Sequence, residues 1–458
     1  MSSAYANRYL GAAEHLPLAR SIYAEMRKYP IISPHGHVDA AMILANKNFT
    51  DPVSLLLSPD HYILRMLHSQ GVTYESLAAN SPEDNWKVLA ANWKLFRSTP
   101  SRIWFQEILA TLFDVSEILA PDNAMKIYNQ INEKLAGPEF KPQQLFKRFN
   151  IELLATTDAT DDSLDAHIKL SQIDLGGRVI PTFRPDGVSD PERPDWKTNL
   201  AALGARYGIE ITTYANLLAA LRKARAHFKD NGATATDHGV LSARTLKLSS
   251  SETEVLFTKA FSGTATQSEI SDFRAAMLFE HALMAADDGL VMQIHPGSLR
   301  NYDAQIYADF GADKGFDIPI ATTYTHELQP MLNAVGKHPN FRAVLFTLDE
   351  SAYSRELAPL AGAYPGLRLG PPWWFHDSLN GLERWRDAIT ETAGYYNTVG
   401  FIDDTRAFAS IPVRHDVARR FDAGYLAREV SRHRITENEA MELAGDLAYN
   451  LSKEFFNL

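Results

Sequence analysis

Residues 31–39 read Ile31-Ile-Ser-Pro-His-Gly-His-Val-Asp39, a short apolar segment that ends in two histidines. We expect a β-strand over 31–35. Alternate residues of a strand face the same side, so the spacing of His35 and His37 turns both imidazoles in one direction. Active sites of parallel α/β barrels lie at the carboxyl ends of such strands.

Seven further apolar segments have the length and composition of buried parallel strands: 151–157, 178–184, 234–238, 289–295, 342–348, 367–373 and 398–404. Helical stretches such as 214–229 and 271–286 follow several of them. Eight strands that alternate with helices predict an α/β fold, a (β/α)₈ TIM barrel, and we expect it to form one domain over residues 1–458.

One long stretch does not fit a bare barrel. Residues 40–150 have helical periodicity, and Pro82 and Pro100 are typical of first helical turns. We interpret this stretch as a helical insertion after the first strand. A helical C-terminus is expected over 413–458, where Thr436 and the glutamates after it resemble a helix start.

Composition excludes several classes of protein. The chain has 458 residues and a net charge of −11, which argues against a nucleic-acid-binding face. It contains no cysteine, so any metal must be held by histidines and carboxylates. No signal peptide or membrane-spanning run is evident, and a cytoplasmic location is expected. Barrel enzymes of this size often self-associate, so we expect a homo-oligomer.

Chemically capable side chains stand where most of the predicted strands end. Two imidazoles from the first strand and a carboxylate from the last would form a three-ligand site for a divalent metal, with a position open to water or substrate. Spacing alone leaves Asp403 and Asp404 as alternatives for the carboxylate. The polar or aromatic residues at strand ends are His35, His37, Arg184, Asp237, His238, His295, Trp373, Trp374, Asp404 and Arg406.

Each of these residues also has a purely structural interpretation. Asp404 could cap a helix, and Arg184 could simply pair with Asp186. Trp373 is more often part of a core than of a binding site. Judged one at a time, Arg300 and Arg406 could equally be ordinary surface arginines or residues of a binding site.

Several motifs, in order along the chain, resemble those of the uronate isomerase (glucuronate isomerase) family of the amidohydrolase superfamily. The resemblance covers almost the whole sequence and places Asp404, not Asp403, at the metal-binding position. The motifs are His35-Gly-His37, Ser58-Pro-Asp-His-Tyr62, Ala155-Thr-Thr-Asp158, Pro181-Thr-Phe-Arg-Pro-Asp186, Thr236-Asp-His-Gly239, Met292-Gln-Ile-His-Pro-Gly-Ser-Leu-Arg-Asn301, Trp373-Trp-Phe375, Asp404-Thr-Arg406 and Arg414-His-Asp-Val-Ala-Arg-Arg420.

The resemblance implies an aldose–ketose isomerase that interconverts D-glucuronate with D-fructuronate, and D-galacturonate with D-tagaturonate, by C2–C1 proton transfer through a cis-enediol. It implies one divalent metal, for which Zn²⁺ is the best candidate. The implied catalytic residues are Tyr62, Asp404 and His295, and the metal ligands are His35, His37 and Asp404. The implied substrate-binding residues are His61, Arg184, Asp237, Arg300, Trp373 and Arg406.

Tyrosine is a poor base unless cationic neighbours lower its pKa, so we expect His61 and nearby arginines to do so for Tyr62. Two other functions remain open. The same scaffold could carry a metal-dependent hydrolase or decarboxylase acting on a related sugar acid, or a barrel that binds sugar acids without catalysis.

Overall fold

Short parallel strands form the centre of the protein, which the computed structural model describes over residues 7–458. Strands that neighbour one another in space also follow one another in the sequence. The hydrogen-bonded order is β1–β2–β4 in one sheet and β3–β5–β6–β7–β10–β11 in the other. The strands are β1 (Ile31–Ser33), β2 (Ile151–Ala155), β3 (Asp158–Ala159), β4 (Arg178–Ile180), β5 (Phe183–Arg184), β6 (Ala235–His238), β7 (Val291–Ile294), β10 (Ala343–Leu345) and β11 (Leu367–Leu369).

The two sheets are parts of one curved sheet. The chain passes from β2 to β3 and from β4 to β5 with only short breaks, and hydrogen bonds bridge these breaks, from Thr156 N to Ile180 O and from Asp158 N to Thr182 O, both at 3.0 Å. The predicted α/β barrel is therefore confirmed. A separate antiparallel pair, β8 (Ser298–Leu299) and β9 (Ile318–Pro319), lies outside the barrel order.

The eighth strand is much shorter than predicted. Within 398–404 only Thr398 pairs, in a parallel bridge with Leu369. Gly400 then takes a φ of +74°, which interrupts an extended strand, and a Cβ there would lie 2.6 Å from Leu447 O. The prediction of a full strand over 398–404 was therefore wrong in extent.

Prolines shorten other predicted strands. Pro34 follows the last residue of β1, and Pro181 separates β4 from β5. Proline cannot donate a ladder hydrogen bond, so it ends or breaks a central strand. The first strand was expected to reach 35. Instead His35 and His37 lie in the loop after it, and loop geometry rather than strand alternation brings them together.

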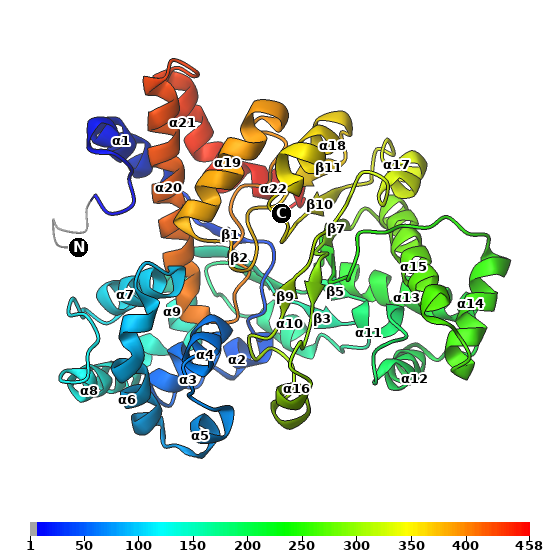
Figure 1. Ribbon diagram of the computed structural model, residues 1–458, viewed down its shortest axis with the longest axis horizontal. Coiled ribbons are helices and arrows are strands. Elements are labelled where there is room, and N and C mark those ends of the chain that lie inside the picture. Colours follow the sequence, from blue (N-terminus) through cyan, green and yellow to red (C-terminus); the bar gives the residue numbers. More distant parts are fainter. Residues whose placement is uncertain (1–6) are drawn as a thin grey trace.

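Helices surround the sheet, with α12–α15 on the right of Figure 1. α15 packs on β7, and α18 packs on β11. The outer helices are α10 (Asp165–Leu170), α11 (Asp186–Ser189), α12 (Trp196–Tyr207), α13 (Tyr214–Asp230), α14 (Ser250–Ser262), α15 (Gln267–Asp288), α16 (Ala304–Phe310), α17 (Gln329–Val335), α18 (Ala358–Ala363) and α19 (Leu379–Ala393).

The stretch between β1 and β2 is helical, as expected, and lies at the lower left of Figure 1. Apart from α5, its helices share one hydrophobic cluster with Ile31 of β1, Leu154 of β2 and Val413 of α20. They are α2 (Ala40–Ala45), α3 (Pro52–Leu56), α4 (His61–His68), α5 (Tyr74–Ala79), α6 (Pro82–Asn92), α7 (Pro100–Leu112), α8 (Ala124–Leu135) and α9 (Pro142–Arg148).

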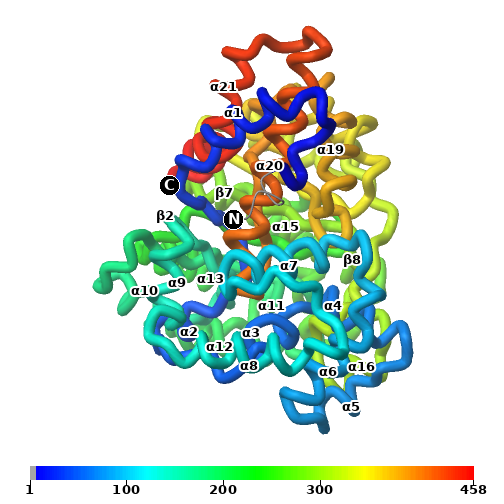
Figure 2. Tube along the Cα trace, turned by 90° about the vertical axis from the view of Figure 1, so that its left-hand side faces the viewer, coloured from blue at the N-terminus to red at the C-terminus, as the bar shows by residue number. Residues whose placement is uncertain are grey.

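The C-terminal region is also helical, with α20 (Ile411–Ser431), α21 (Glu437–Gly445) and α22 (Leu451–Phe455). Thr436 caps α21 in a reciprocal capping box with Glu439. Figure 2 shows α1 (Leu16–Met26) beside α20 and α21, where Ile22 and Leu426 share a buried cluster. Among residues 7–458, none of the helices combines the length and apolar character needed to cross a membrane.

Candidate active site

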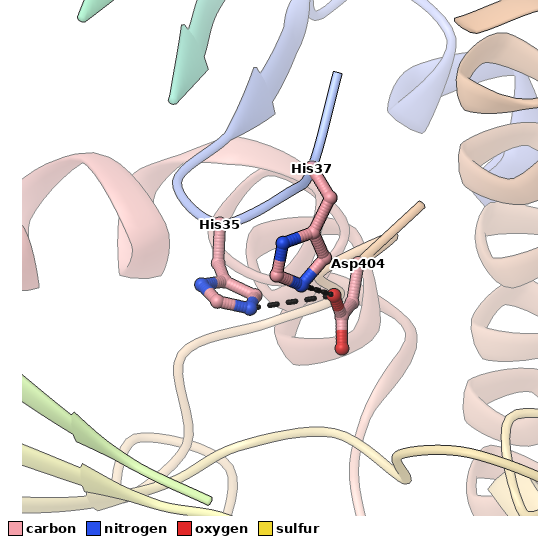
Figure 3. Close-up of side chains that lie close together, drawn as sticks. All are labelled: His35, His37 and Asp404. Atoms are coloured by element: carbon pink, nitrogen blue, oxygen red, sulfur yellow. Dashed lines mark ion pairs between the residues drawn. The ribbon is translucent and has the colours of Figure 1, made fainter. Parts of the chain in front are cut away.

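Two histidines and one aspartate converge at the carboxyl edge of the barrel (Figure 3). The Nε2 atoms of His35 and His37 lie 3.3 and 3.1 Å from the same oxygen, Asp404 Oδ1. Two ligand atoms bound about 2.1 Å from one tetrahedral ion would lie roughly 3.4 Å apart. The three side chains therefore have the spacing of ligands to a single divalent cation.

The chemistry of this group also fits a cation. Burial opposes ionisation of Asp404, but His35 and His37 outweigh it and hold the pKa of Asp404 well below its usual range. Asp404 Oδ1 is buried and accepts no hydrogen bond from any of residues 7–458. The backbone of Asp404 has a φ of +38°, which is costly for a residue with a side chain and recurs at functional sites.

A second group with ligand spacing consists of His35, Asp237 and His295. It suits a metal less well because both carboxylate oxygens of Asp237 are already paired. Oδ1 lies 2.8 Å from His295 Nδ1, and Oδ2 lies 3.2 Å from a terminal nitrogen of Arg184.

Asp403 faces a different environment from Asp404. Its carboxylate is buried and lies 2.8 Å from Nε2 of His415, on α20. Of the two candidate carboxylates, the structure therefore places that of Asp404, not that of Asp403, beside the two histidines after β1.

His295, directly after β7, presents one free nitrogen to the cavity. Burial lowers the pKa of His295 to about 4, so its ring is neutral at neutral pH. Nδ1–H donates to Asp237, whose pKa stays well below its usual range because Arg184, His35 and His295 outweigh its burial. Nε2 of His295 is buried, accepts no hydrogen bond within residues 7–458, and carries the lone pair.

Three arginines contribute positive charge. Arg184 Nε lies 2.8 Å from Asp186 Oδ2, so the pairing with Asp186 that the sequence suggested is present. Arg184 also forms an ion pair with Asp237. A terminal nitrogen of Arg406 lies 3.0 Å from Asp313, and one of Arg300 lies 3.5 Å from Asp317.

A glycine makes room for two of these arginines. A Cβ on Gly239, after β6, would lie 2.6 Å from a terminal nitrogen of Arg184 and 3.2 Å from one of Arg300. The Thr236-Asp-His-Gly239 motif therefore supplies Asp237 and the space for its cationic neighbours.

His61 and Tyr62 begin α4 of the helical insertion, and their rings stack with centroids 4.9 Å apart. The expectation that cationic neighbours lower the pKa of Tyr62 was wrong. Burial and the nearby carboxylate of Asp377 raise that pKa well above its usual value, and Arg414 opposes them only in part. Burial also lowers the pKa of His61 to about 4, so its ring supplies no positive charge at neutral pH.

All eleven residues that the family resemblance implies for the site line one cavity. They are His35, His37, His61, Tyr62, Arg184, Asp237, His295, Arg300, Trp373, Asp404 and Arg406. This inner cavity has a volume of about 30 Å³, enough to hold at least one water molecule. An adjoining cavity of about 490 Å³ shares Arg184, Arg300 and Arg406 with it and lies in the size range of small-molecule sites.

Sequence reasoning gave no role in the site to three residues close to Tyr62. Asp60 and Arg414 line the same cavity, and Asp377 accepts a hydrogen bond from the Tyr62 hydroxyl. Asp60 also caps α4, which is enough to explain an aspartate at that position. Arg414 lies within a long helix, where an arginine gives no signal of a binding site. Asp377 follows the Trp373-Trp-Phe375 motif by two residues and had no other signal.

Comparison with known proteins gives a consistent assignment. The family model described as glucuronate isomerase matches residues 1–456. The uronate isomerase of Rhizobium meliloti is 50% identical over 96% of both chains, and that of Rhizorhabdus wittichii is 52% identical over 96% of this chain and 95% of its own.

Solved structures agree with the sequence comparisons. The crystal structure of glucuronate isomerase from Caulobacter crescentus superposes with a TM-score of 0.96 at 46% identity, over 98% of this chain and 96% of the other. The uronate isomerase of Thermotoga maritima superposes with a TM-score of 0.94 at 29% identity, over 98% and 99%. The chain is thus an isomerase and belongs to the glucuronate isomerase family.

Proposed function

We propose that this enzyme interconverts D-glucuronate with D-fructuronate, and D-galacturonate with D-tagaturonate, by moving a proton between C2 and C1 through a cis-enediol. One observation carries the proposal: two histidines and an aspartate with the spacing of metal ligands, a neutral histidine and three arginines line a single cavity, in a chain of this family. A metal-dependent hydrolase or decarboxylase is not favoured, because the relatives carry the isomerase name.

His35, His37 and Asp404 would hold the metal, and Zn²⁺ suits two imidazoles and a carboxylate best. When bound, the cation would polarise the oxygens of the sugar's reacting end. The Asp404 carboxylate is ionised and can accept a hydroxyl proton, so we also assign it to proton transfer between O2 and O1 of the substrate.

His295 is placed to accept or donate a hydrogen bond at the same end of the sugar. Its ring is neutral, and Nε2 is the nitrogen that Asp237 leaves free. The tautomer is thereby fixed, as in other sites where a carboxylate orients an imidazole. Tyr62 is the candidate for the group that faces C2, and Trp373, whose ring lies 4.7 Å from that of His295, would close the pocket.

The substrate carboxylate needs an arginine whose charge is not already neutralised. Arg184 is paired to two aspartates and Arg406 to one at 3.0 Å, whereas the nearest carboxylate to Arg300 lies 3.5 Å away. Arg300 also sits over the ring of Trp374 at 5.1 Å, which holds its guanidinium plane. We therefore assign the carboxylate to Arg300, with Arg406 and His61 contacting the sugar hydroxyls.

A cytoplasmic location and a homo-oligomeric state belong to the same proposal. The lack of cysteine agrees with a reducing compartment, and light scattering measures the oligomeric state directly.

Incubation of the purified enzyme with each uronate, followed by NMR, tests the proposed function. We expect the corresponding ketose from at least one uronate and no product from a panel of amides and lactones. Release of carbon dioxide, or hydrolysis of the panel without ketose formation, would support the alternative function instead.

A further inference from the structure

The contacts of Tyr62 reveal a second buried carboxylate behind the site. The Tyr62 hydroxyl donates to Asp377 Oδ1 at 3.1 Å and accepts from the backbone N–H of Phe375 at 3.0 Å. A tyrosine oxygen has one proton and two lone pairs. One lone pair of Tyr62 therefore remains for a group in the cavity that it lines.

Asp377 is held in place from its other side. A terminal nitrogen of Arg414 donates to Asp377 Oδ2 at 3.0 Å and to the backbone oxygen of Asp403 at 3.2 Å. The Arg414 guanidinium lies 3.7 Å from the ring centre of Trp104, on α7 of the helical insertion. This arginine thus joins the insertion, the loop after β11 and the residue next to the metal-ligand aspartate.

The backbone around Asp377 is also constrained. Phe375 has a φ of +59°, which is unfavourable for a large side chain. Its N–H points at the Tyr62 hydroxyl because of this conformation, and its ring contacts Tyr62 edge-on with centroids 5.4 Å apart. Such strain persists only where the surroundings over-determine it, and it gathers at functional sites.

We propose that Asp377, held by Arg414, is the proton acceptor behind Tyr62, so that the tyrosine takes the C2 proton of the sugar while passing its own proton to Asp377. The inference rests on the proposed function and deepens it. Asp377 does not line the inner cavity and acts through Tyr62, which makes it a positioning residue. Many active sites use a similar arrangement, in which a reacting group is activated by a second group that a third one orients.

The step balances. The C2–H bond breaks, a new O–H bond forms on Tyr62, and the former hydroxyl proton moves to Asp377. The C2–H electron pair becomes the C1–C2 double bond, and the carbonyl electrons move to O1. In the return step Tyr62 gives a proton to C1 and recovers one from Asp377. At the same time the O2–H bond breaks, O2 becomes the C2 carbonyl oxygen, and the proton released from O2 passes through Asp404 to O1. No other reactant is consumed.

This arrangement also accounts for a tyrosine base whose pKa is raised rather than lowered. A free tyrosinate is unfavourable in this buried place, since burial and the carboxylate both oppose it. Concerted transfer to Asp377 avoids forming one. The pKa of Asp377 is itself raised, mainly by burial, so the carboxylate can hold a proton for the lifetime of the intermediate.

A double-mutant cycle tests the coupling, with kcat and KM for glucuronate measured for Tyr62→Phe, Asp377→Asn and the pair. We expect each single variant to lose about 100-fold or more in kcat, the range of general acid–base catalysis, with KM changed by less than about threefold. The double variant should be no slower than Tyr62→Phe, because residues that act as one unit are not additive. Losses that multiply in the double variant, or a kcat of Asp377→Asn within about threefold of wild type, would overturn the proposal.

Two controls separate this role from a structural one. Asp422→Asn breaks a matched buried pair, in which Asp422 lies 3.0 Å from Arg386 and Arg386 lies over Trp385 at 4.4 Å. It should lower the melting temperature as Asp377→Asn does but leave kcat near wild type. If Asp377→Asn does not fold, Asp377→Ser, which also removes the carboxylate, replaces it in the same cycle, and the same comparison with Tyr62→Phe decides. A wild-type enzyme without uronate turnover would contradict the proposed function rather than this relay.

Discussion

The side chains of Asp237 and His295 are joined by a hydrogen bond of 2.8 Å between neighbouring strands of the barrel. The bond leaves Nε2 of His295 as the nitrogen available to the substrate. The position of a proton in the site is therefore decided by a residue on a different strand, β6, from the one that leads to the histidine, β7.

Asp237→Asn should disturb this arrangement without changing the shape of the side chain. An amide nitrogen facing Nδ1 favours the other tautomer, in which Nε2 carries the proton. We expect kcat to fall by about 100-fold or more, as when the orienting carboxylate of a triad is replaced. An unchanged kcat would show that the tautomer of His295 does not matter to turnover.

Asp404→Asn should lower metal content and turnover together. An amide is a weaker ligand than a carboxylate and cannot carry the hydroxyl proton. Metal analysis should give about one divalent ion per wild-type chain and substantially less in the variant. Chelation of the wild-type enzyme should reduce turnover only in part, because isomerisation needs no metal-bound hydroxide.

Near-normal metal content and turnover in Asp404→Asn would contradict both roles of this residue. Complete loss of activity on chelation, restored by Zn²⁺, would instead show that turnover depends entirely on the metal.

Arg300→Met should affect substrate affinity more than the chemical step. Loss of a charge-assisted pair to a carboxylate costs about 2–4 kcal/mol, so KM for glucuronate should rise by roughly 30-fold or more, with a smaller change in kcat. Arg300→Lys should recover part of the affinity. The exposed Arg222, which pairs with Asp287 at 2.9 Å, offers a control, because Arg222→Met should leave KM unchanged. A KM unaffected by Arg300→Met would move the carboxylate to Arg184 or Arg406.

Acid should destabilise the fold through buried histidines other than His35 and His37. Burial lowers the pKa of His238 to about 3 and that of the adjacent His281 well below its usual value. Because the folded-state pKa is lower than the unfolded value near 6.5, stability is complete above about pH 6.5 and falls as the pH decreases. His238 alone should lower the free energy of unfolding by about 2 kcal/mol at pH 5.

Denaturant unfolding at pH 7.5 and pH 5 measures this loss. His238→Gln can retain a hydrogen bond to Thr236, which now lies 2.8 Å from His238 Nε2, and should reduce the difference between the two pH values. Substitution of the exposed His433 serves as the control. Equal pH dependence in wild type and His238→Gln would show that this histidine is not buried in its neutral form.

Much of the barrel could be predicted because buried parallel strands are almost continuously apolar, as in 289–295 and 342–348. The strand ends could not be predicted, since Pro34, Pro181 and Gly400 end or interrupt strand pairing within sequence runs that remain apolar. Family motifs found the residues around His35, His37 and Asp404. Asp377 was missed because its importance depends on a contact with Tyr62, 315 residues away in the sequence. That residues 1–458 form one domain stays a prediction, supported by the hydrophobic cluster that joins the insertion to β1, β2 and α20.

Anomalous diffraction from crystals loaded with Zn²⁺ and soaked with glucuronate tests the central claim most directly. The account predicts one strong peak about 2.0–2.2 Å from His35 Nε2, His37 Nε2 and an oxygen of Asp404, with the C1–C2 end of the sugar beside it and its carboxylate at Arg300. A peak held by other residues, or a sugar bound away from these three ligands, would contradict it.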